Sequence, residues 1–205
     1  MYVARILYPV EVLGPGKRIG IWMVGCKHKC KGCSNPELWV QTPNYCISAE
    51  KFKELIQSIC DNFPVDGFTI SGGEPFLVPN DLNQMLDIIK FYCKDILVYS
   101  GYKLETLQND EECLKCLSKI AVLIDGLYIE ELNNNSFIRG SSNQRIIVLN
   151  KSFEEKYHRY AANGKNQIQK FMLKSGGFIS VGITGKNFKD DLINVAATKD
   201  LLIDK

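Results

Sequence analysis

The chain has 205 residues, 45% of them hydrophobic, which is enough for a substantial core but short for two full domains. Its 25 basic and 23 acidic residues nearly cancel, so the overall charge gives no reason to expect binding to nucleic acid or to an anionic membrane. The first residues do not form a basic segment followed by an apolar one, and no apolar run is long enough to span a bilayer. We therefore expect a cytoplasmic protein whose partners include neither nucleic acid nor a membrane.

Short apolar runs alternate with amphipathic segments along most of the chain. The runs that predict buried strands lie at residues 20–24, 67–71, 96–99, 121–124 and 146–149. Apolar residues at helical spacing predict helices over 48–60, with Ser48 as the N-cap, and near 80–89 and 114–120. This alternation is typical of parallel strands joined by right-handed crossovers, with ligands at the carboxyl ends of the strands. There are too few units for a closed eight-stranded barrel, so we predict an α/β fold in the form of an open, partial parallel β/α barrel.

The character of the sequence changes in its last quarter. A polar, helix-like stretch covers residues 154–162, and two apolar-rich runs, 168–174 and 178–183, flank a Ser-Gly-Gly turn. Two such runs around a Gly-Gly pair predict a β-hairpin. We therefore divide the chain into a core domain, residues 1–150, and a small C-terminal appendage, residues 151–205, that contains this hairpin.

Eight cysteines are a high count for such a chain. An exported miniprotein would use them as a disulfide framework, but without an export signal a reducing cytosol favours metal ligands or buried thiols. Cys113 and Cys116 fall in a predicted helix without two further cysteines nearby, so we interpret them as structural thiols, with a redox pair or part of a second cluster as the alternative. The isolated Cys46, Cys60 and Cys93 are expected to be small, buried hydrophobic residues.

Three further cysteines, Cys26, Cys30 and Cys33, lie within eight residues, directly after the first predicted strand. Three thiolates this close in one loop suit three corners of a cubane iron–sulfur cluster, which prefers soft anionic sulfur ligands. No fourth cysteine lies nearby in the sequence, so one iron would stay open and could chelate a substrate. The loop therefore predicts a catalytic cluster rather than an electron carrier.

A structural zinc site is the alternative, with His28 or a distant cysteine as the fourth ligand. Usual zinc spacings pair two cysteines with two remote ligands instead of gathering three in one loop. The lysines beside the cysteines would favour thiolates with either metal. His28 also has a simpler interpretation as an exposed loop residue. The spacing thus favours the iron–sulfur cluster.

A second motif, Ser71-Gly72-Gly73-Glu74-Pro75, follows the next predicted strand. Together with the C-x3-C-x2-C loop, in this order, it resembles the two signatures of radical S-adenosylmethionine (SAM) enzymes. The sequence further resembles the group of activases that install a glycyl radical in anaerobic ribonucleotide reductase, and this resemblance covers about residues 1–149. The matching segments are 14–18, His28, 32–37 with Trp39, 99–102, 123–126 and 139–145.

The resemblance implies one [4Fe–4S] cluster on Cys26, Cys30 and Cys33, with SAM on its open iron and reductive cleavage of SAM to methionine and a 5′-deoxyadenosyl radical. It also implies that Gly72 and Gly73 let the backbone approach the methionine moiety closely. The other cofactor-binding residues that we expect are Gly32 and Ser34, Glu74 as acceptor for the ammonium group, and Ser100 and Asp125 near the ribose. The implied partners are a glycyl radical enzyme, namely anaerobic ribonucleotide reductase, and a one-electron donor such as flavodoxin.

Two other functions stay open. A radical SAM enzyme of this kind could act on another protein or on a ribosomally made peptide, with the appendage as recognition element, because activases of this group usually end soon after segment 139–145. A neighbouring gene for a glycyl radical reductase or for a short precursor peptide would discriminate the two. A non-catalytic metal-binding scaffold is the third hypothesis, and the intact motifs count against it. Trp39, Tyr102 and segment 139–145 could line a channel or contact a partner, although packing alone would explain them.

Overall fold

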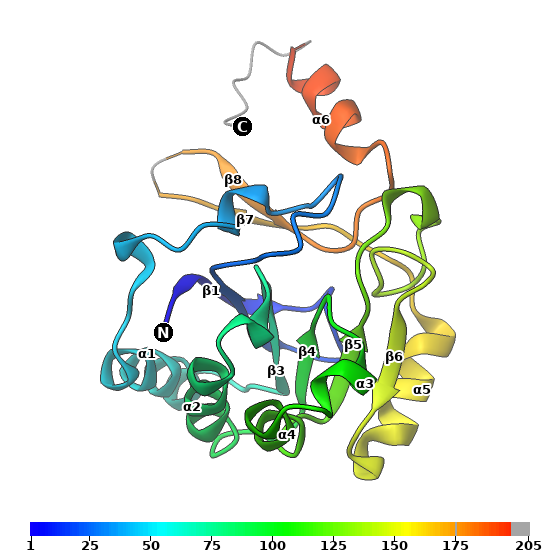
Figure 1. Cartoon of the computed structure of the whole chain (residues 1–205). Coiled ribbons are helices and arrows are strands. Elements are labelled where there is room, and N and C mark those ends of the chain that lie inside the picture. Colours follow the sequence, from blue (N-terminus) through cyan, green and yellow to red (C-terminus); the bar gives the residue numbers. More distant parts are fainter. Residues whose placement is uncertain (175, 198–205) are drawn as a thin grey trace.

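A computed structural model describes residues 1–174 and 176–197 and has the predicted mixed α/β character. Six strands form one sheet in the spatial order β1 to β6 (Figure 1). They are β1 (Val3–Val10), β2 (Arg18–Met23), β3 (Gly67–Gly72), β4 (Ile96–Tyr99), β5 (Val122–Asp125) and β6 (Arg145–Val148). Strands β2 to β5 are parallel, whereas the edge strands β1 and β6 are antiparallel to their neighbours. That the sheet curves into a partial barrel stays a prediction.

The two edge strands are antiparallel to their neighbours, a feature that the sequence does not predict. Strand β1 is not predictable from its apolar pattern, because Arg5 and Pro9 interrupt it. Both are tolerated because an edge strand leaves one side unpaired. Strand β6 occupies the predicted position but runs antiparallel, because its connection from β5, residues 126–144, contains a short 3-10 helix, Glu130–Leu132, and no crossover helix.

Helices cover one face of the sheet. They are α1 (Ala49–Asn62), α2 (Pro79–Ile89), the short α3 (Leu104–Leu107) and α4 (Glu111–Leu117). Ser48 caps α1, as predicted, by accepting a hydrogen bond from the backbone N–H of Lys51 (3.2 Å). The inward residues of α1, α2 and α4 pack against alternate residues of the parallel strands and form the main hydrophobic core. Its members include Ile19, Ile21, Phe52, Ile56, Phe68, Ile70, Leu82, Met85, Leu86, Ile89, Val98 and Leu123.

Much of the C-terminal segment packs on the opposite face of the sheet. It contains α5 (Glu154–Asn163), the predicted antiparallel hairpin of β7 (Gln169–Met172) and β8 (Phe178–Val181), and α6 (Phe188–Ala197). Residue Ser175 of the predicted hairpin turn and residues 198–205 of the predicted appendage lie outside the described residues. The hairpin shares a small core with β1, β2 and the segment after the cysteine loop, whereas α6 extends away from the sheet (Figure 1). The members of this small core are Val10, Leu13, Trp22, Val24, Leu38 and Val181, with Phe171 and Ile179 partly buried against them.

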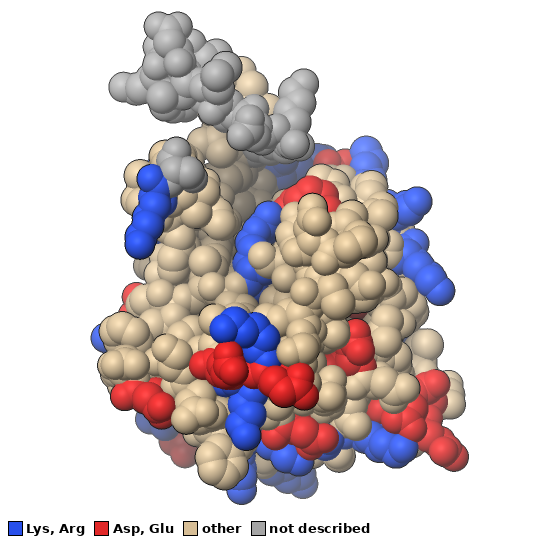
Figure 2. Space-filling view, turned by 90° about the vertical axis from the view of Figure 1, so that its left-hand side faces the viewer, with Lys and Arg blue, Asp and Glu red and all other residues tan. Residues whose placement is uncertain are grey.

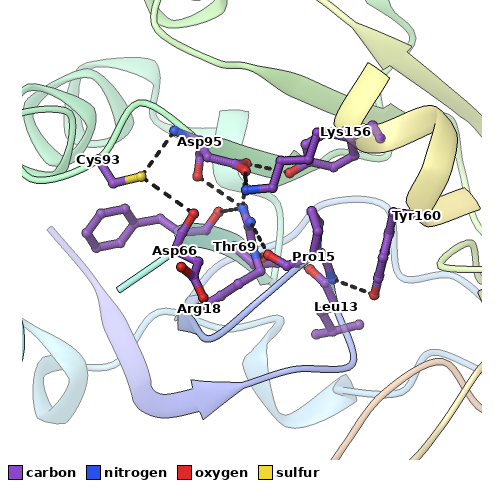
Figure 3. A network of polar contacts seen from close by, with 12 residues as sticks. Leu13, Pro15, Arg18, Asp66, Thr69, Cys93, Asp95, Lys156 and Tyr160 are labelled. Carbon is purple, nitrogen blue, oxygen red and sulfur yellow. Dashed lines mark hydrogen bonds and ion pairs between the residues drawn. The ribbon is translucent and has the colours of Figure 1, made fainter. Parts of the chain in front are cut away.

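A buried ion pair at the amino ends of the parallel strands fastens α5 to the sheet (Figure 3). Arg18, the first residue of β2, is completely buried and donates to the Thr69 hydroxyl (2.7 Å) and to the Asp95 carboxylate (3.1 Å). From α5, Lys156 (2.5 Å) and Tyr157 (2.6 Å) donate to the same carboxylate. Burial alone would raise the pKa of Asp95, but its three donors hold that pKa below its usual value. Arg18 therefore has a structural role at the end of the sheet opposite the cysteine loop.

No helix in the described ranges is both long and apolar enough to cross a membrane. On the face shown in Figure 2, the acidic and basic side chains of the described residues lie intermixed. Charge on that face is therefore balanced locally, in keeping with the formal net charge of +2 for the whole chain.

Candidate functional site

The cysteines of the C-x3-C-x2-C motif lie in the loop that directly follows β2. Because β2 is parallel to β3 and β4, this loop lies at the carboxyl edge of the sheet, where such folds place their ligands. Backbone hydrogen bonds hold its two ends together, from Gly25 N–H to the Leu38 carbonyl (2.8 Å) and from Cys26 N–H to the Trp39 carbonyl (2.9 Å). Lys29, between two of the cysteines, has a positive φ of 49°, so the chain turns sharply there. The result is a closed loop that presents three thiols.

The thiols of Cys26, Cys30 and Cys33 are half-buried and unpaired by disulfides. Burial raises the pKa of Cys26, whereas hydrogen bonds from the backbone N–H groups of His28 and Lys29 oppose the rise; burial and the two neighbouring cysteines raise the pKa of Cys30. Backbone hydrogen bonds to cysteine sulfur are one means by which proteins adjust the potential of iron–sulfur clusters. Within the described part of the chain, no three His, Cys, Asp or Glu side chains converge on one metal ion. The ligand spacing favours a cluster over a single zinc ion, because usual zinc sites pair two cysteines with two remote ligands.

The Gly72-Gly73 turn at the end of β3 faces the stem of the cysteine loop. Gly72 has a φ of 107°, and a Cβ there would lie 2.3 Å from the carbonyl oxygen of Met23. A Cβ on Gly73 would lie 2.3 Å from the carbonyl oxygen of Gly25. The backbone N–H groups of Gly73 and Glu74 donate to these same two oxygens, each at 2.8 Å, and so extend the pairing with β2. Both glycines are thus required by packing against β2 and its loop, whether or not a ligand is bound.

The carboxylate of Glu74 lies at the centre of the site, and only 2% of the residue is exposed. Oε1 accepts hydrogen bonds from the backbone N–H of Phe76 (3.0 Å) and from the Ser100 hydroxyl (2.9 Å). Oε2 accepts from the backbone N–H of Gly101 (2.7 Å) and lies 3.0 Å from Nε2 of His28. The interpretation of His28 as an exposed loop residue is therefore wrong, because its ring points inward onto a buried carboxylate. One side chain thus joins the cysteine loop, the end of β3 and the end of β4.

Gly32 and Ser34 lie at the exposed surface of the cysteine loop. Gly32 has a φ of 70°, and a Cβ there would lie 2.6 Å from Oε1 of Glu130, whose carboxylate also pairs with Lys31 (2.8 Å). This contact joins the cysteine loop to the segment after β5. The side chain of Ser34 has no hydrogen-bond partner among the residues that the structure describes. Gly32 and Ser34, both predicted to contact SAM, are exposed to solvent.

Asp125, at the carboxyl end of β5, is buried and already has protein partners. One oxygen accepts from Nε of Arg145 (2.9 Å) and the other from the backbone N–H of Leu104 (2.7 Å). Arg145 also binds both oxygens of Glu105, each at 2.8 Å, and lowers the pKa of Glu105 to about 2. A ribose contact by Asp125, or by Ser100 with its bond to Glu74, would compete with these protein bonds, and the contact itself stays a prediction.

Segment 139–145, which the sequence left as either a partner contact or a loop, supports the connection after β5. Oε1 of Gln144 accepts from the backbone N–H of Gly140 (2.8 Å), and its Nε2 donates to the carbonyl of Gly126 (2.8 Å). The side chain of Asn143 donates to the carbonyl of Leu127 (2.8 Å), and the Ser141 hydroxyl accepts from the next turn of the connection, at residue 129 (3.1 Å). The only signal for this role in the sequence is the run of short polar side chains, which is common to most loops.

The remaining cysteines lie outside this loop. Cys113 and Cys116 are buried in α4, and burial raises the pKa of each thiol to about 12, so both are protonated at neutral pH as structural thiols would be. Cys60 and Cys93 are half-buried. The prediction that Cys46 is buried is wrong. Its side chain is exposed because it ends a surface 3-10 helix, Pro43–Tyr45, and pairs with residue 2 through its backbone.

Comparison with known proteins gives two findings. The family model described as "4Fe-4S single cluster domain" matches residues 12–147. The anaerobic ribonucleoside-triphosphate reductase-activating protein of Enterobacteria phage T4 is 33% identical over 146 residues, which cover 68% of this chain and 90% of the phage protein. The protein of the same name from Escherichia coli (strain K12) is 34% identical over 146 residues, which cover 68% of this chain and 94% of that protein. The one from Haemophilus influenzae is 36% identical over 147 residues, which cover 68% of this chain and 93% of that protein.

Proposed function

Because this chain belongs to the 4Fe-4S single cluster domain family and to the anaerobic ribonucleoside-triphosphate reductase-activating proteins, we propose that it is a radical SAM activase of a glycyl radical enzyme. The observation that carries the proposal is the loop of Cys26, Cys30 and Cys33 at the carboxyl edge of the sheet, beside the Gly72-Gly73 turn. Three thiolates in one loop are the ligand set of a cubane whose fourth iron is left to a substrate.

A [4Fe–4S] cluster bound there would supply the electron that cleaves SAM to methionine and a 5′-deoxyadenosyl radical, which takes a hydrogen atom from the partner's glycine. The residues of this chain bind and orient the reactants. The three cysteines would hold the cluster through their thiolates, and the cluster would in turn bind the amino and carboxylate groups of SAM. The groups that we propose to contact SAM are Gly32 and Ser34, which are exposed on the loop, and the backbone at Gly72 and Gly73.

The proposed partner is an anaerobic ribonucleotide reductase, which the names of the relatives support. The electron would come from a small one-electron donor such as flavodoxin. A second candidate function, modification of another protein or of a ribosomally made peptide, is favoured by one observation. The relatives match 68% of this chain but 90% to 94% of themselves, so this chain carries a segment that they lack.

The chemistry is tested by reconstituting the protein anaerobically with iron and sulfide, reducing it, adding SAM and quantifying 5′-deoxyadenosine. Cys30→Ala removes one ligand, and Cys113→Ala is the matched control, because it removes a buried thiol of α4. We expect a full cluster and product from the wild type and from Cys113→Ala, and neither from Cys30→Ala. A wild type that binds a full cluster but yields no product, even with the reductase and a strong reductant present, contradicts the proposal.

The partner is tested with the same loaded protein. Mixed with an anaerobic ribonucleotide reductase from the same organism, SAM and reductant, it should produce a glycyl radical that electron paramagnetic resonance (EPR) detects. Substituting alanine for the radical-bearing glycine of the reductase should abolish the signal. SAM cleavage without a radical on the reductase would favour the second candidate function.

A further inference from the structure

The carboxylate of Glu74 has no vacant acceptor position for a ligand. A carboxylate offers about four lone-pair sites. Four protein groups face them at 2.7–3.0 Å, namely the backbone N–H groups of Phe76 and Gly101, the hydroxyl of Ser100 and Nε2 of His28. Since an ionised carboxylate only accepts, we assign the hydrogen of the last contact to Nε2 of His28. The ammonium group of SAM would have to displace one of these donors and leave it unsatisfied in a buried site.

The ring of His28 is held from several directions. Its side chain is only 15% exposed, and its ring meets that of Tyr102 edge-on, with the centroids 4.5 Å apart. A Cβ on Gly101 would lie 2.5 Å from Cδ2 of His28, so the ring fills the space that this glycine leaves. The ring of His28 therefore packs between the cysteine loop and the end of β4, and its hydrogen bond to Glu74 fixes the position of the ring.

We infer that His28 and Glu74 form a positioning pair that fixes the cysteine loop in the geometry that binds the cluster and SAM, an inference that rests on the proposed function. His28 lies midway between Cys26 and Cys30, so a displacement of its ring moves both ligands. Groups that orient metal ligands through hydrogen bonds commonly change metal affinity by about 10-fold to 100-fold when they are removed. Glu74 thus acts on SAM through His28 and the loop, not as a ligand of the ammonium group.

The experiment separates the hydrogen bond from the packing of the ring. His28→Phe keeps an aromatic ring against Tyr102 but has no donor, whereas His28→Gln keeps an N–H donor at a similar reach. His158→Gln is the matched control, because His158 is the other histidine of the chain and is exposed on α5. For each protein we would measure the melting temperature without metal, the rate of iron loss to a chelator, and the SAM concentration that half-converts the EPR spectrum of the reduced cluster.

We expect His28→Phe to lose iron roughly tenfold faster than the wild type and to need roughly tenfold more SAM, the equivalent of one lost hydrogen bond to a charged group. His28→Gln and His158→Gln should stay within about threefold of the wild type in both measurements, because each retains the donor at Glu74. Rescue by glutamine is the sign of a positioning bond, since a purely structural ring would be replaced better by phenylalanine.

The inference is overturned if His28→Phe equals the wild type in iron loss and SAM binding, or if His28→Gln is as defective as His28→Phe. Should His28→Phe not fold, Glu74→Gln carries the same test, because it keeps the shape but turns one acceptor oxygen into a donor. A wild type that holds its cluster but shows no response to SAM would refute the proposed function instead. In that case the rate of iron loss alone still decides whether the pair positions the loop.

Discussion

Replacing Gly72 with alanine tests whether the Gly-Gly turn is shaped by its contact with β2. The new Cβ would lie 2.3 Å from the carbonyl oxygen and 2.6 Å from the nitrogen of Met23, and neither backbone atom can rotate away. Any side chain is also strained at a φ of 107°. Gly126→Ala is the matched control, because Gly126 has a φ of 103° but its nearest neighbouring atom would be 3.8 Å from the Cβ. Both variants carry the backbone strain, and only Gly72→Ala adds the clash.

The magnitudes follow from these two effects. Strain from a left-handed backbone costs about 1–2 kcal/mol in each variant. Forced displacement of close-packed atoms adds about 1–3 kcal/mol in Gly72→Ala. For a chain of this size each kcal/mol lowers the melting temperature by about 2–4 °C, so Gly72→Ala should unfold about 2–12 °C below Gly126→Ala. The assay is thermal unfolding of the metal-free proteins by far-UV circular dichroism, and equal melting temperatures would refute the reasoning.

Four further predictions concern the buried Asp95 and the cysteines of α4. Asp95→Asn leaves a buried guanidinium without its counter-ion, so urea unfolding should show a loss of about 3–5 kcal/mol, and unchanged stability would contradict the role of the ion pair. The folded-state pKa of Asp95 lies below its unfolded value. The wild type therefore has this stabilisation above about pH 4 and loses it as the pH falls through the folded pKa. The free energies of unfolding of the wild type and of Asp95→Asn should thus converge in acid. Tyr157→Phe removes one donor to the same carboxylate and should cost about 1–3 kcal/mol in the same measurement, whereas no loss would mean that the remaining donors suffice. In the folded, metal-free protein, Cys113 and Cys116 should resist a thiol reagent near neutral pH while Cys46 reacts, and mass spectrometry that found equal labelling would show that α4 opens.

The elements that the sequence predicts correctly are those determined by neighbouring residues. The apolar run of β2, the capping serine of α1 and the paired apolar runs of the β7–β8 hairpin each need only a short window of sequence. The cysteine motif is equally local, since three candidate ligands lie in one loop, and its role as the cluster ligand set stays a prediction. Local pattern therefore locates the parallel centre of the sheet and the candidate cluster loop.

Features that depend on distant partners were not predicted. His28 and Glu74 are 46 positions apart, and the sequence around each residue does not indicate a contact with the other. Strand direction in β6 depends on the absence of a crossover helix after β5, and the polar residues between them give no sign of that. Gly72 and Gly73 were predicted for a ligand contact, whereas the structure shows that the backbone of β2 already requires them. Packing against β2 is thus a reason for these glycines that the sequence did not reveal, and the ligand contact stays a prediction.

The attachment of α5 bears on how the C-terminal segment can be gained or lost. Lys156 and Tyr157 bind Asp95, the carboxylate that also neutralises the buried Arg18. A nonsense mutation that removed residues 151–205 would withdraw both groups from Asp95 and uncover Trp22 on the sheet. We expect cellular proteases to degrade such a destabilised product before it could bind any partner. Selection can therefore retain this segment for the sake of stability alone, whatever it contributes to recognition.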